Sequence, residues 1–150
     1  MSKIVTVAIA GLGNRGRNTY AETANIFPDK MKIVAVADVD PERVAEAARE
    51  FHIPEEACFS SAEEMLAQDH LADVMVISTQ DRQHVGHAIP ALRKGYHLLL
   101  EKPISPFLEE CKELLKVAKE CDRKVVVSHV LRYTPIFKKV KELIDSGIIG

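Results

Sequence analysis

The sequence predicts an α/β domain in which a doubly wound parallel sheet is covered by helices on both faces. Three observations support this prediction: short β-branched runs alternate with helical stretches, these runs are almost continuously apolar, and a glycine pattern joins the first run to the first helix. Strands that are covered on both faces lack apolar–polar alternation, so continuous apolar runs favour this arrangement. The 150 residues, 47% of them hydrophobic, suffice for one domain with a full core.

Five apolar runs are expected to form the main strands of this sheet. They cover Ile4 to Ala10, Ile33 to Asp38, Val74 to Ser78, His97 to Leu100 and Val125 to His129. The dipeptide Cys58-Phe59 could add a short edge strand.

The segments between these runs have helical composition and apolar spacing near 3.6 residues. The expected helices cover Arg15 to Asn25, Pro41 to Phe51, Ala62 to Gln68, Gln83 to Lys94 and Pro106 to Cys121. Asp40 and Ser105 each precede a proline and are expected to cap the helices that follow, and Gly95 is expected to end the fourth helix. Pro90 lies inside the fourth helical pattern and should kink this helix or move its start.

The last segment departs from the strand–helix alternation. Pro135 to Ser146 is expected to form an amphipathic helix that Gly147 ends, and a new apolar segment then begins. We therefore expect a dinucleotide-binding domain over residues 1–133, and a helix with the start of a connection over residues 134–150. On this interpretation the natural protein continues beyond Gly150.

Charge and cysteine content argue against several classes of partner and site. The formal charge is −2, from 20 basic and 22 acidic residues that are interspersed, which argues against nucleic acid or an anionic membrane as partner. No apolar run approaches the roughly 18 to 20 residues of a membrane span. Three cysteines without Cys-x-x-Cys spacing argue against a disulfide framework and a thiolate zinc site, and they favour the reducing cytoplasm.

A glycine pattern follows the first strand and opens the first helix, which is the context in which such a pattern binds a dinucleotide. It reads Gly11-Leu12-Gly13-Asn14-Arg15-Gly16. Gly11 permits the tight turn, Gly13 admits the pyrophosphate to the backbone, and Gly16 allows the helix to pack closely on the strand. Free N–H groups at the start of the helix would face the phosphates. The sequence therefore predicts a Rossmann fold that binds NAD(P).

Asp38 ends the second strand 22 residues after Gly16, close to the spacing of the carboxylate that binds the adenine ribose of NAD. A carboxylate here would repel a 2′-phosphate, so we expect NAD as the cofactor. Arg43 keeps NADP open, and Asp38 could instead be only a turn residue.

Polar residues after a later strand are expected to border the nicotinamide half of the cofactor, because the carboxyl ends of parallel strands meet at one edge. These residues are Ser78, Thr79 and Gln80. His84 on the next helix is expected near the cofactor as well. His84 and His87 lie three residues apart, but no third ligand has suitable spacing, so we expect no metal site.

The tripeptide Glu101-Lys102-Pro103 follows the apolar run that ends at Leu100. A lysine at this edge, partly desolvated beside a cationic nicotinamide ring, would release its proton more readily. Lys102 is therefore expected to transfer a proton or to polarise a substrate oxygen, and Glu101 to orient Lys102 or to contact the cofactor ribose. Without these neighbours, Lys102 would be interpreted as a solvated lysine beside a loop proline.

Taken together, these motifs resemble the glucose-fructose oxidoreductase, inositol dehydrogenase and MocA family. The resemblance covers the whole chain and rests on the glycine pattern, Ala37-Asp38-Val39-Asp40, Thr79 with His84, Gly95 before Glu101-Lys102-Pro103, and Arg132-Tyr133-Thr134-Pro135. It implies an oxidoreductase that transfers a hydride between NAD(P) and a sugar, cyclitol or related alcohol. In such an enzyme Lys102 would be the catalytic residue that handles the proton.

The resemblance has further implications for this chain. It implies that the Lys102-Pro103 peptide is cis and that Arg132 lies near cofactor or substrate, whereas His129 fits core packing as well as a ligand role. Members of the family continue into a larger sheet domain that supplies the substrate pocket, and the full-length protein is expected to be a homo-oligomer. Without that domain no substrate is held in a reactive geometry, so we expect weak NAD binding and no appreciable turnover.

Two other functions remain compatible with the sequence. One is an NAD(H)-sensing or scaffold module that uses the same fold without catalysis. The other is a methyltransferase, because these enzymes also have a glycine-rich first loop and an acidic residue after the second strand. The lysine at the sheet edge favours the oxidoreductase over both.

Overall fold

The computed structural model describes residues 3–149 and contains a six-stranded sheet whose strands are all parallel. The strands are β1 (Val5–Ala10), β2 (Met31–Ala37), β3 (Cys58–Phe59), β4 (Val74–Ile77), β5 (His97–Leu100) and β6 (Val125–Val127). Their spatial order is β3-β2-β1-β4-β5-β6, the order of dinucleotide-binding folds, in which the direction of winding reverses between β1 and β4. The expected doubly wound parallel sheet is confirmed, and Cys58-Phe59 forms one of its edges.

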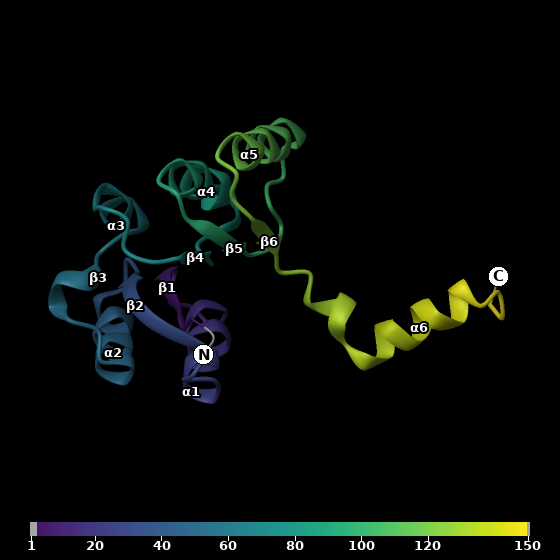
Figure 1. Ribbon diagram of the computed structural model, residues 1–150, viewed down its shortest axis with the longest axis horizontal. Helices are drawn as coiled ribbons and strands as arrows, with labels where there is room; N and C mark the ends of the chain where they lie inside the picture. Colours follow the sequence, from purple (N-terminus) through teal and green to yellow (C-terminus); the bar gives the residue numbers. More distant parts are fainter. Residues whose placement is uncertain (1–2, 150) are drawn as a thin grey trace.

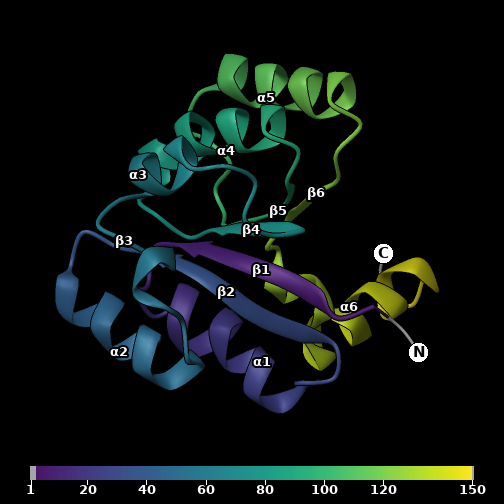
Figure 2. The ribbon, with the colours of Figure 1, turned by 60° about the vertical axis from the view of Figure 1, so that its left-hand side comes forward.

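Helices cover both faces of the sheet, as Figure 2 shows. On one face lie the π-helical turn η1 (Gly16–Ala21), its continuation α1 (Glu22–Ile26) and α2 (Pro41–Phe51). The other face is covered by α3 (Ala62–Ala67), α4 (His84–Arg93) and α5 (Leu108–Glu120). Because crossover connections return each strand to the same end of the sheet, the loops that follow the strands all lie at one edge.

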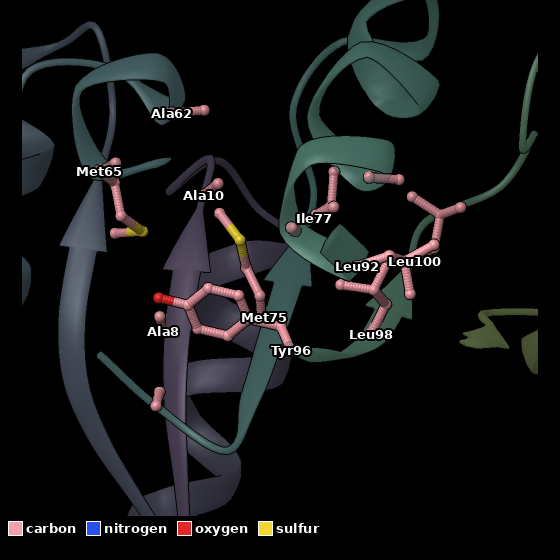
Figure 3. Close-up of a cluster of buried hydrophobic side chains, with 14 of the residues drawn as sticks. Ala8, Ala10, Ala62, Met65, Met75, Ile77, Leu92, Tyr96, Leu98 and Leu100 are labelled. Carbon is pink, nitrogen blue, oxygen red and sulfur yellow. The ribbon is translucent and has the colours of Figure 1, made fainter. Parts of the chain in front are cut away.

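Two apolar clusters, one on each face, hold the helices against the sheet. Along β1 the side chains alternate between them: Val7 and Ile9 belong to the cluster beside α1 and α2, whereas Ala8 and Ala10 belong to the cluster beside α3, α4 and α5. Figure 3 shows this second cluster, in which the buried Met75 of β4 lies among side chains from several elements. Because the central strand has small residues on one face, large side chains from the helices pack closely against it. The packed sheet is therefore a rigid support for the residues at its carboxyl edge.

Two boundary expectations were wrong. The helix α5 begins at Leu108 and not at Pro106, because Ser105 Oγ accepts a hydrogen bond from Phe107 N at 3.0 Å and forms a turn ahead of the helix. The helix α4 begins at His84, directly after the 3-10 turn η3 (Asp81–Gln83), and runs through Pro90, so the alternative in which Pro90 moves the start of the helix was wrong. A kink at Pro90 stays a prediction. Pro90 is exposed on the outer side of α4, where its ring meets solvent.

Other helix ends agree with the expectation. Asp40 caps α2 by accepting a hydrogen bond from Glu42 N at 3.0 Å. Gly95 follows α4 with a φ of +99°, in the left-handed region that favours glycine.

The chain leaves the sheet after β6, passes through the 3-10 turn η4 (Val130–Tyr133) and ends in α6 (Pro135–Asp145). Figure 1 shows that α6 extends away from the sheet. None of the residues of α6 is buried, and Ile136 and Phe137 are 70% and 48% exposed. Over residues 3–149, none of the helices combines the length and the apolar character that a membrane span requires.

Candidate functional site

The register of the sheet places a row of polar or small residues at its carboxyl edge. Five residues are paired in register across the neighbouring strands β2, β1, β4, β5 and β6: Ala37, Ala10, Ile77, Leu100 and Val127. The next residue on each strand therefore lies in one row, and these residues are Asp38, Gly11, Ser78, Glu101 and Ser128. This row joins the glycine turn to the Glu101-Lys102-Pro103 loop, although the two are about ninety residues apart in the sequence.

Gly11 is held between β2 and β4. The N–H of Gly11 donates to the carbonyl oxygen of Ala37 at 2.8 Å, and Ser78 Oγ donates to the carbonyl oxygen of Gly11 at 2.8 Å. Its φ is +91°, and a Cβ at this position would lie 2.5 Å from the carbonyl oxygen of Ser78. The expected role of Gly11 in the tight turn therefore has two physical causes, backbone conformation and lack of space.

The other two glycines differ in what surrounds them. A Cβ on Gly16 would lie 1.8 Å from the carbonyl oxygen of Gly11, so the packing of η1 on the turn requires glycine. A Cβ on Gly13 would meet no atom within 4 Å, and Gly13 lines a surface pocket. Space that the chain itself leaves open fits the close approach of a dinucleotide phosphate to the backbone.

Asp38 is 9% exposed and is bonded to the glycine turn. Its Oδ2 accepts a hydrogen bond from Leu12 N at 2.6 Å, and its Oδ1 accepts one from Asp40 N at 2.9 Å. These two bonds use only part of the acceptor capacity of a carboxylate, and Asp38 also lines the pocket. Asp38 thus stabilises the turn, and its contact with a ribose stays a prediction.

The pocket beside the glycine turn, here called the glycine pocket, contains many of the residues expected for the cofactor. Those that line it are Gly11, Gly13, Asp38, Ser78, Thr79 and Gln80. Its lining also contains Ala37, Val39, Arg43, Ala62, Glu63, Gln83 and His87. Among the other expected residues, Leu12 is buried and Asn14 is exposed next to the turn.

Ala62 and Glu63 were not expected at the cofactor site. They form the first turn of α3, which follows the edge strand β3. Because the carboxyl ends of all parallel strands meet at one edge, the short run Cys58-Phe59 was the signal from which both could have been predicted. His87 lies in the same pocket and was considered only as a metal ligand.

A second set of polar side chains, here called the Glu101 cluster, joins η1 to the ends of β5 and β6. It consists of Arg15, Tyr20, Glu101 and Ser128. Arg15 Nε donates to Glu101 Oε1 at 2.7 Å, and the Tyr20 hydroxyl donates to the same oxygen. Arg15 Nη2 also donates to Ser128 Oγ at 3.3 Å. Tyr20 and Ser128 were not expected here, because only the tertiary structure brings them to the edge.

The pKa values in this cluster reflect burial and hydrogen bonding. Burial raises the pKa of Glu101, but the hydrogen bonds from Tyr20, from Arg15 and from the Lys102 backbone together lower it below its ordinary value. Burial, and then the hydrogen bond to Glu101, raise the pKa of Tyr20. Glu101 is therefore an ionised carboxylate that binds a neutral phenol and a guanidinium.

Lys102 lies in a loop that is held at both ends. The Lys102-Pro103 peptide is cis, as expected. The N–H of Lys102 donates to Glu101 Oε2 at 3.0 Å, and the carbonyl oxygen of Pro103 lies 2.7 Å from Nδ1 of His84. The Lys102 side chain is exposed, so the residues described here do not provide the expected desolvation. Glu101 thus orients the backbone of Lys102.

His84 is 1% exposed and connects two loops. Its Nδ1 faces the carbonyl oxygen of Pro103, and its Nε2 lies 3.2 Å from the carbonyl oxygen of Thr79. This geometry gives His84 a positioning role between β4 and the lysine loop, and a direct contact with cofactor stays a prediction. Over residues 3–149, no group of three or more metal-ligating side chains occurs.

Two residues after β6 lie apart from the glycine pocket. Arg132 is exposed on η4 and lines a separate hollow together with Phe137 of α6. His129 is exposed, so the alternative of core packing was wrong for this residue. A contact of Arg132 with cofactor or substrate stays a prediction.

Comparison with known proteins shows that the chain is similar to oxidoreductases. Residues 5–129 match a family described as an oxidoreductase family with an NAD-binding Rossmann fold. The chain is 27% identical over 151 aligned residues to an inositol 2-dehydrogenase of Corynebacterium glutamicum, and the match covers 100% of this chain and 44% of that protein.

Two solved structures are similar over almost the whole chain. The WlbA dehydrogenase from Bordetella pertussis, in complex with NADH and UDP-GlcNAcA, superposes with a TM-score of 0.86 at 27% identity, over 99% of this chain and 44% of that one. The scyllo-inositol dehydrogenase from Lactobacillus casei, with bound NAD(H) and scyllo-inositol, superposes with a TM-score of 0.85 at 25% identity, over 99% and 43%. The chain therefore spans less than half the length of these relatives.

Proposed function

The chain belongs to the oxidoreductase family with an NAD-binding Rossmann fold, and from this premise we propose that it is the nucleotide-binding half of a dehydrogenase. The enzyme transfers a hydride between NAD and the carbon of a CH–OH group in a sugar, cyclitol or related alcohol. The names of the relatives, an inositol 2-dehydrogenase and a scyllo-inositol dehydrogenase among them, support this substrate class.

One observation is the main support for this function. The Lys102 loop and the glycine turn lie at the same carboxyl edge of the sheet, and the ion pair between Arg15 and Glu101 joins them directly. Ligands of open α/β sheets bind at this edge, near the reversal of strand order. A lysine is thus held next to the place where a dinucleotide would end.

In this proposal Lys102 is the general base of alcohol oxidation. Bound NAD supplies the acceptor for the hydride that leaves the substrate carbon. Nζ of Lys102 accepts the hydroxyl proton, so that the C–H and O–H bonds break and a C=O bond forms. Glu101 and His84 hold the loop so that the amine stays at one position during the transfer.

We propose NAD rather than NADP as the cofactor. The carboxylate of Asp38 lines the glycine pocket, and a 2′-phosphate near it would be repelled. Arg43, the side chain that could bind such a phosphate, lies 3.3 Å from Asp40 Oδ2 and 3.9 Å from Asp38 Oδ1. Its charge is therefore already compensated by two carboxylates.

We also propose that residues 1–133 form the dinucleotide-binding domain and that residues 134–150 lead to a substrate domain. The exposed apolar side chains of α6 and the lengths of the relatives support this division. The substrate is then held only in the longer protein, so we expect no turnover from this chain alone. The three free thiols support the expected location in the reducing cytoplasm.

The test compares two variants of the longer protein. We expect Lys102→Ala to lower kcat for inositol oxidation by about 10²- to 10⁴-fold, because proton transfer is lost, and to change NAD affinity less than threefold. We expect Gly13→Ala to keep the melting temperature, because its Cβ meets open space, but to weaken NAD binding at least tenfold. The measurements are steady-state kinetics, NAD titration calorimetry and thermal unfolding.

The two variants separate the parts of the proposal. Undiminished turnover by Lys102→Ala would assign catalysis to another residue. NAD binding by the unmodified protein without oxidation of any polyol would instead favour a sensing or scaffold module.

A further inference from the structure

Three side chains from different elements form a continuous polar array in the glycine pocket. Thr79 Oγ1, after β4, lies 3.0 Å from Nδ1 of His87 on α4, and Nε2 of His87 lies 2.9 Å from Oε1 of Glu63 at the start of α3. All three residues line the pocket. His87 is 5% exposed, whereas the side chain of Glu63 is 68% exposed.

The hydrogen-bonding capacities of these groups determine which atom donates and which accepts in each of the two hydrogen bonds. The hydrogen bond from His87 lowers the pKa of Glu63, so this carboxylate is ionised and can only accept. Nε2 of His87 must then be the donor to Glu63. In the tautomer with a single N–H group at Nε2, Nδ1 is an acceptor and receives the hydroxyl hydrogen of Thr79.

This direction determines what Thr79 offers to a ligand. Because its hydrogen is directed at His87, the hydroxyl oxygen presents only lone pairs to the pocket. The neighbouring Asp38 carboxylate is also an acceptor. A ligand that uses both must bring hydrogen-bond donors, and the adenosine half of NAD has two kinds, the ribose hydroxyls and the exocyclic amino group of adenine.

We propose that Glu63 and His87 are positioning residues that orient the hydroxyl of Thr79 as an acceptor for a donor on the adenosine half of the cofactor. This proposal replaces the expectation that Thr79 borders the nicotinamide half, because Thr79 shares the glycine pocket with Asp38 and Glu63. This inference rests on the proposed function, because it requires NAD in the glycine pocket. It goes further in assigning a role to two residues that lie outside the glycine pattern and outside the lysine loop.

The first measurement needs no cofactor. The ¹⁵N chemical shifts of the His87 ring in the ligand-free chain report which nitrogen holds the proton. We expect Nε2 to be protonated and Nδ1 to be unprotonated, and we expect Glu63→Ala to produce a mixture of the two tautomers. Protonation of Nδ1 in the unmodified chain, with or without Nε2, would overturn the inference.

The second measurement is NAD affinity by titration calorimetry. We expect Thr79→Val, which keeps the shape but removes the hydroxyl, to weaken binding about five- to tenfold, and Thr79→Ser to stay within about twofold. Glu63→Ala should weaken binding about two- to fivefold. The matched control is Glu64→Ala on the same turn of α3, because Glu64 binds Ser60 and does not line the pocket.

An NAD analogue identifies which group of the cofactor donates to Thr79. In this analogue hypoxanthine replaces adenine, so that a carbonyl oxygen replaces the amino group. If the amino group is the donor, Thr79→Val no longer weakens binding of this analogue relative to the unmodified chain. If a ribose hydroxyl is the donor, the five- to tenfold difference persists.

The outcomes separate this inference from the proposed function. Equal NAD affinity of the unmodified chain and a folded Thr79→Val variant would overturn the inference and leave the proposed function intact. Failure of the unmodified chain to bind NAD would refute the proposed function, and the role of Thr79 toward NAD with it. Thermal unfolding of each variant establishes that it is folded.

Discussion

At the scale of the residue, Glu101 is a buried carboxylate that connects the end of β5 to the glycine turn. It is 6% exposed, and its two oxygens accept hydrogen bonds from Arg15, Tyr20 and the Lys102 backbone. A buried carboxylate is costly unless it is paired and hydrogen-bonded, and here both conditions are met. The same carboxylate therefore stabilises the fold and connects the lysine loop to the glycine turn.

The lowered pKa of Glu101 predicts how its contribution varies with pH. Because the pKa in the folded chain lies below the ordinary value of 4.5, the unfolded chain takes up a proton first on acidification. The stabilisation is therefore fully present above about pH 4.5 and is lost as the pH falls through the folded pKa. Glu101→Gln removes this dependence, because the amide does not titrate.

We expect Glu101→Gln to lower the free energy of unfolding at pH 7 by about 1 to 3 kcal/mol, the usual range for hydrogen bonds to a charged group. The difference from the unmodified chain should shrink as the pH falls from about 4.5 through the lowered pKa of Glu101. Urea unfolding at a series of pH values measures it. Glu113→Gln on the exposed side of α5 is the control, and a pH-independent difference would contradict the assignment.

At the scale of the element, the end of α2 shows a helix that stops without glycine. His52 follows Phe51 with a φ of +54°, in the left-handed region, and Ile53 N donates to the carbonyl oxygen of Ala48 at 2.9 Å. This conformation costs a residue with a Cβ roughly 1 to 2 kcal/mol, and glycine adopts it freely. The end of α2 was nevertheless predicted correctly, because the apolar spacing stops at Phe51.

We expect His52→Gly to raise the free energy of unfolding by about 0.5 to 1 kcal/mol, since relief of the backbone conformation exceeds the entropy that glycine adds to the unfolded chain. His52→Ala keeps a Cβ and should change stability by less than about 0.5 kcal/mol. Thermal or urea unfolding distinguishes the two. A gain of equal size in both variants would point to the lost imidazole and not to the backbone.

At the scale of the whole molecule, stability resides in the sheet and the helices that cover it. Together, the two apolar clusters contain residues of β1 to β6 and of α1 to α5, and α6 contributes to neither. The apolar side chains of α6 remain exposed, with Val140 at 39% and Ile144 at 50%. A helix that buries nothing cannot add much to the free energy of unfolding.

We therefore expect a chain that ends at residue 133 to unfold cooperatively, with a melting temperature within about 3 °C of that of the 150-residue chain. It should also associate less, because a patch of exposed apolar side chains is removed. Calorimetry and sedimentation velocity measure both properties. A fall of about 10 °C or more would mean that α6 belongs to the folded domain.

Most elements of the fold could be predicted because each depends on local patterns. Continuous apolar runs located the strands, and Asp40 and Gly95 located two helix ends. The start of α5 could not be located in this way, because Ser105 bonds to a turn residue and not to a helical one. The glycine turn was predictable for the same local reason, since its three glycines serve a single strand–turn–helix unit.

The sequence by itself determined the parallel α/β fold, the family resemblance and the positions of the glycine turn and of Lys102, because periodicity and motif spacing act over short stretches of chain. Only the tertiary structure decided which side chains meet at the edge. Tyr20, Ser128, Glu63 and His87 belong to elements far apart in the sequence, and the register of the strands together with helix packing brings them to the site. The physical reason is that a hydrogen bond depends on distances of about 3 Å, which strand pairing sets and sequence spacing does not.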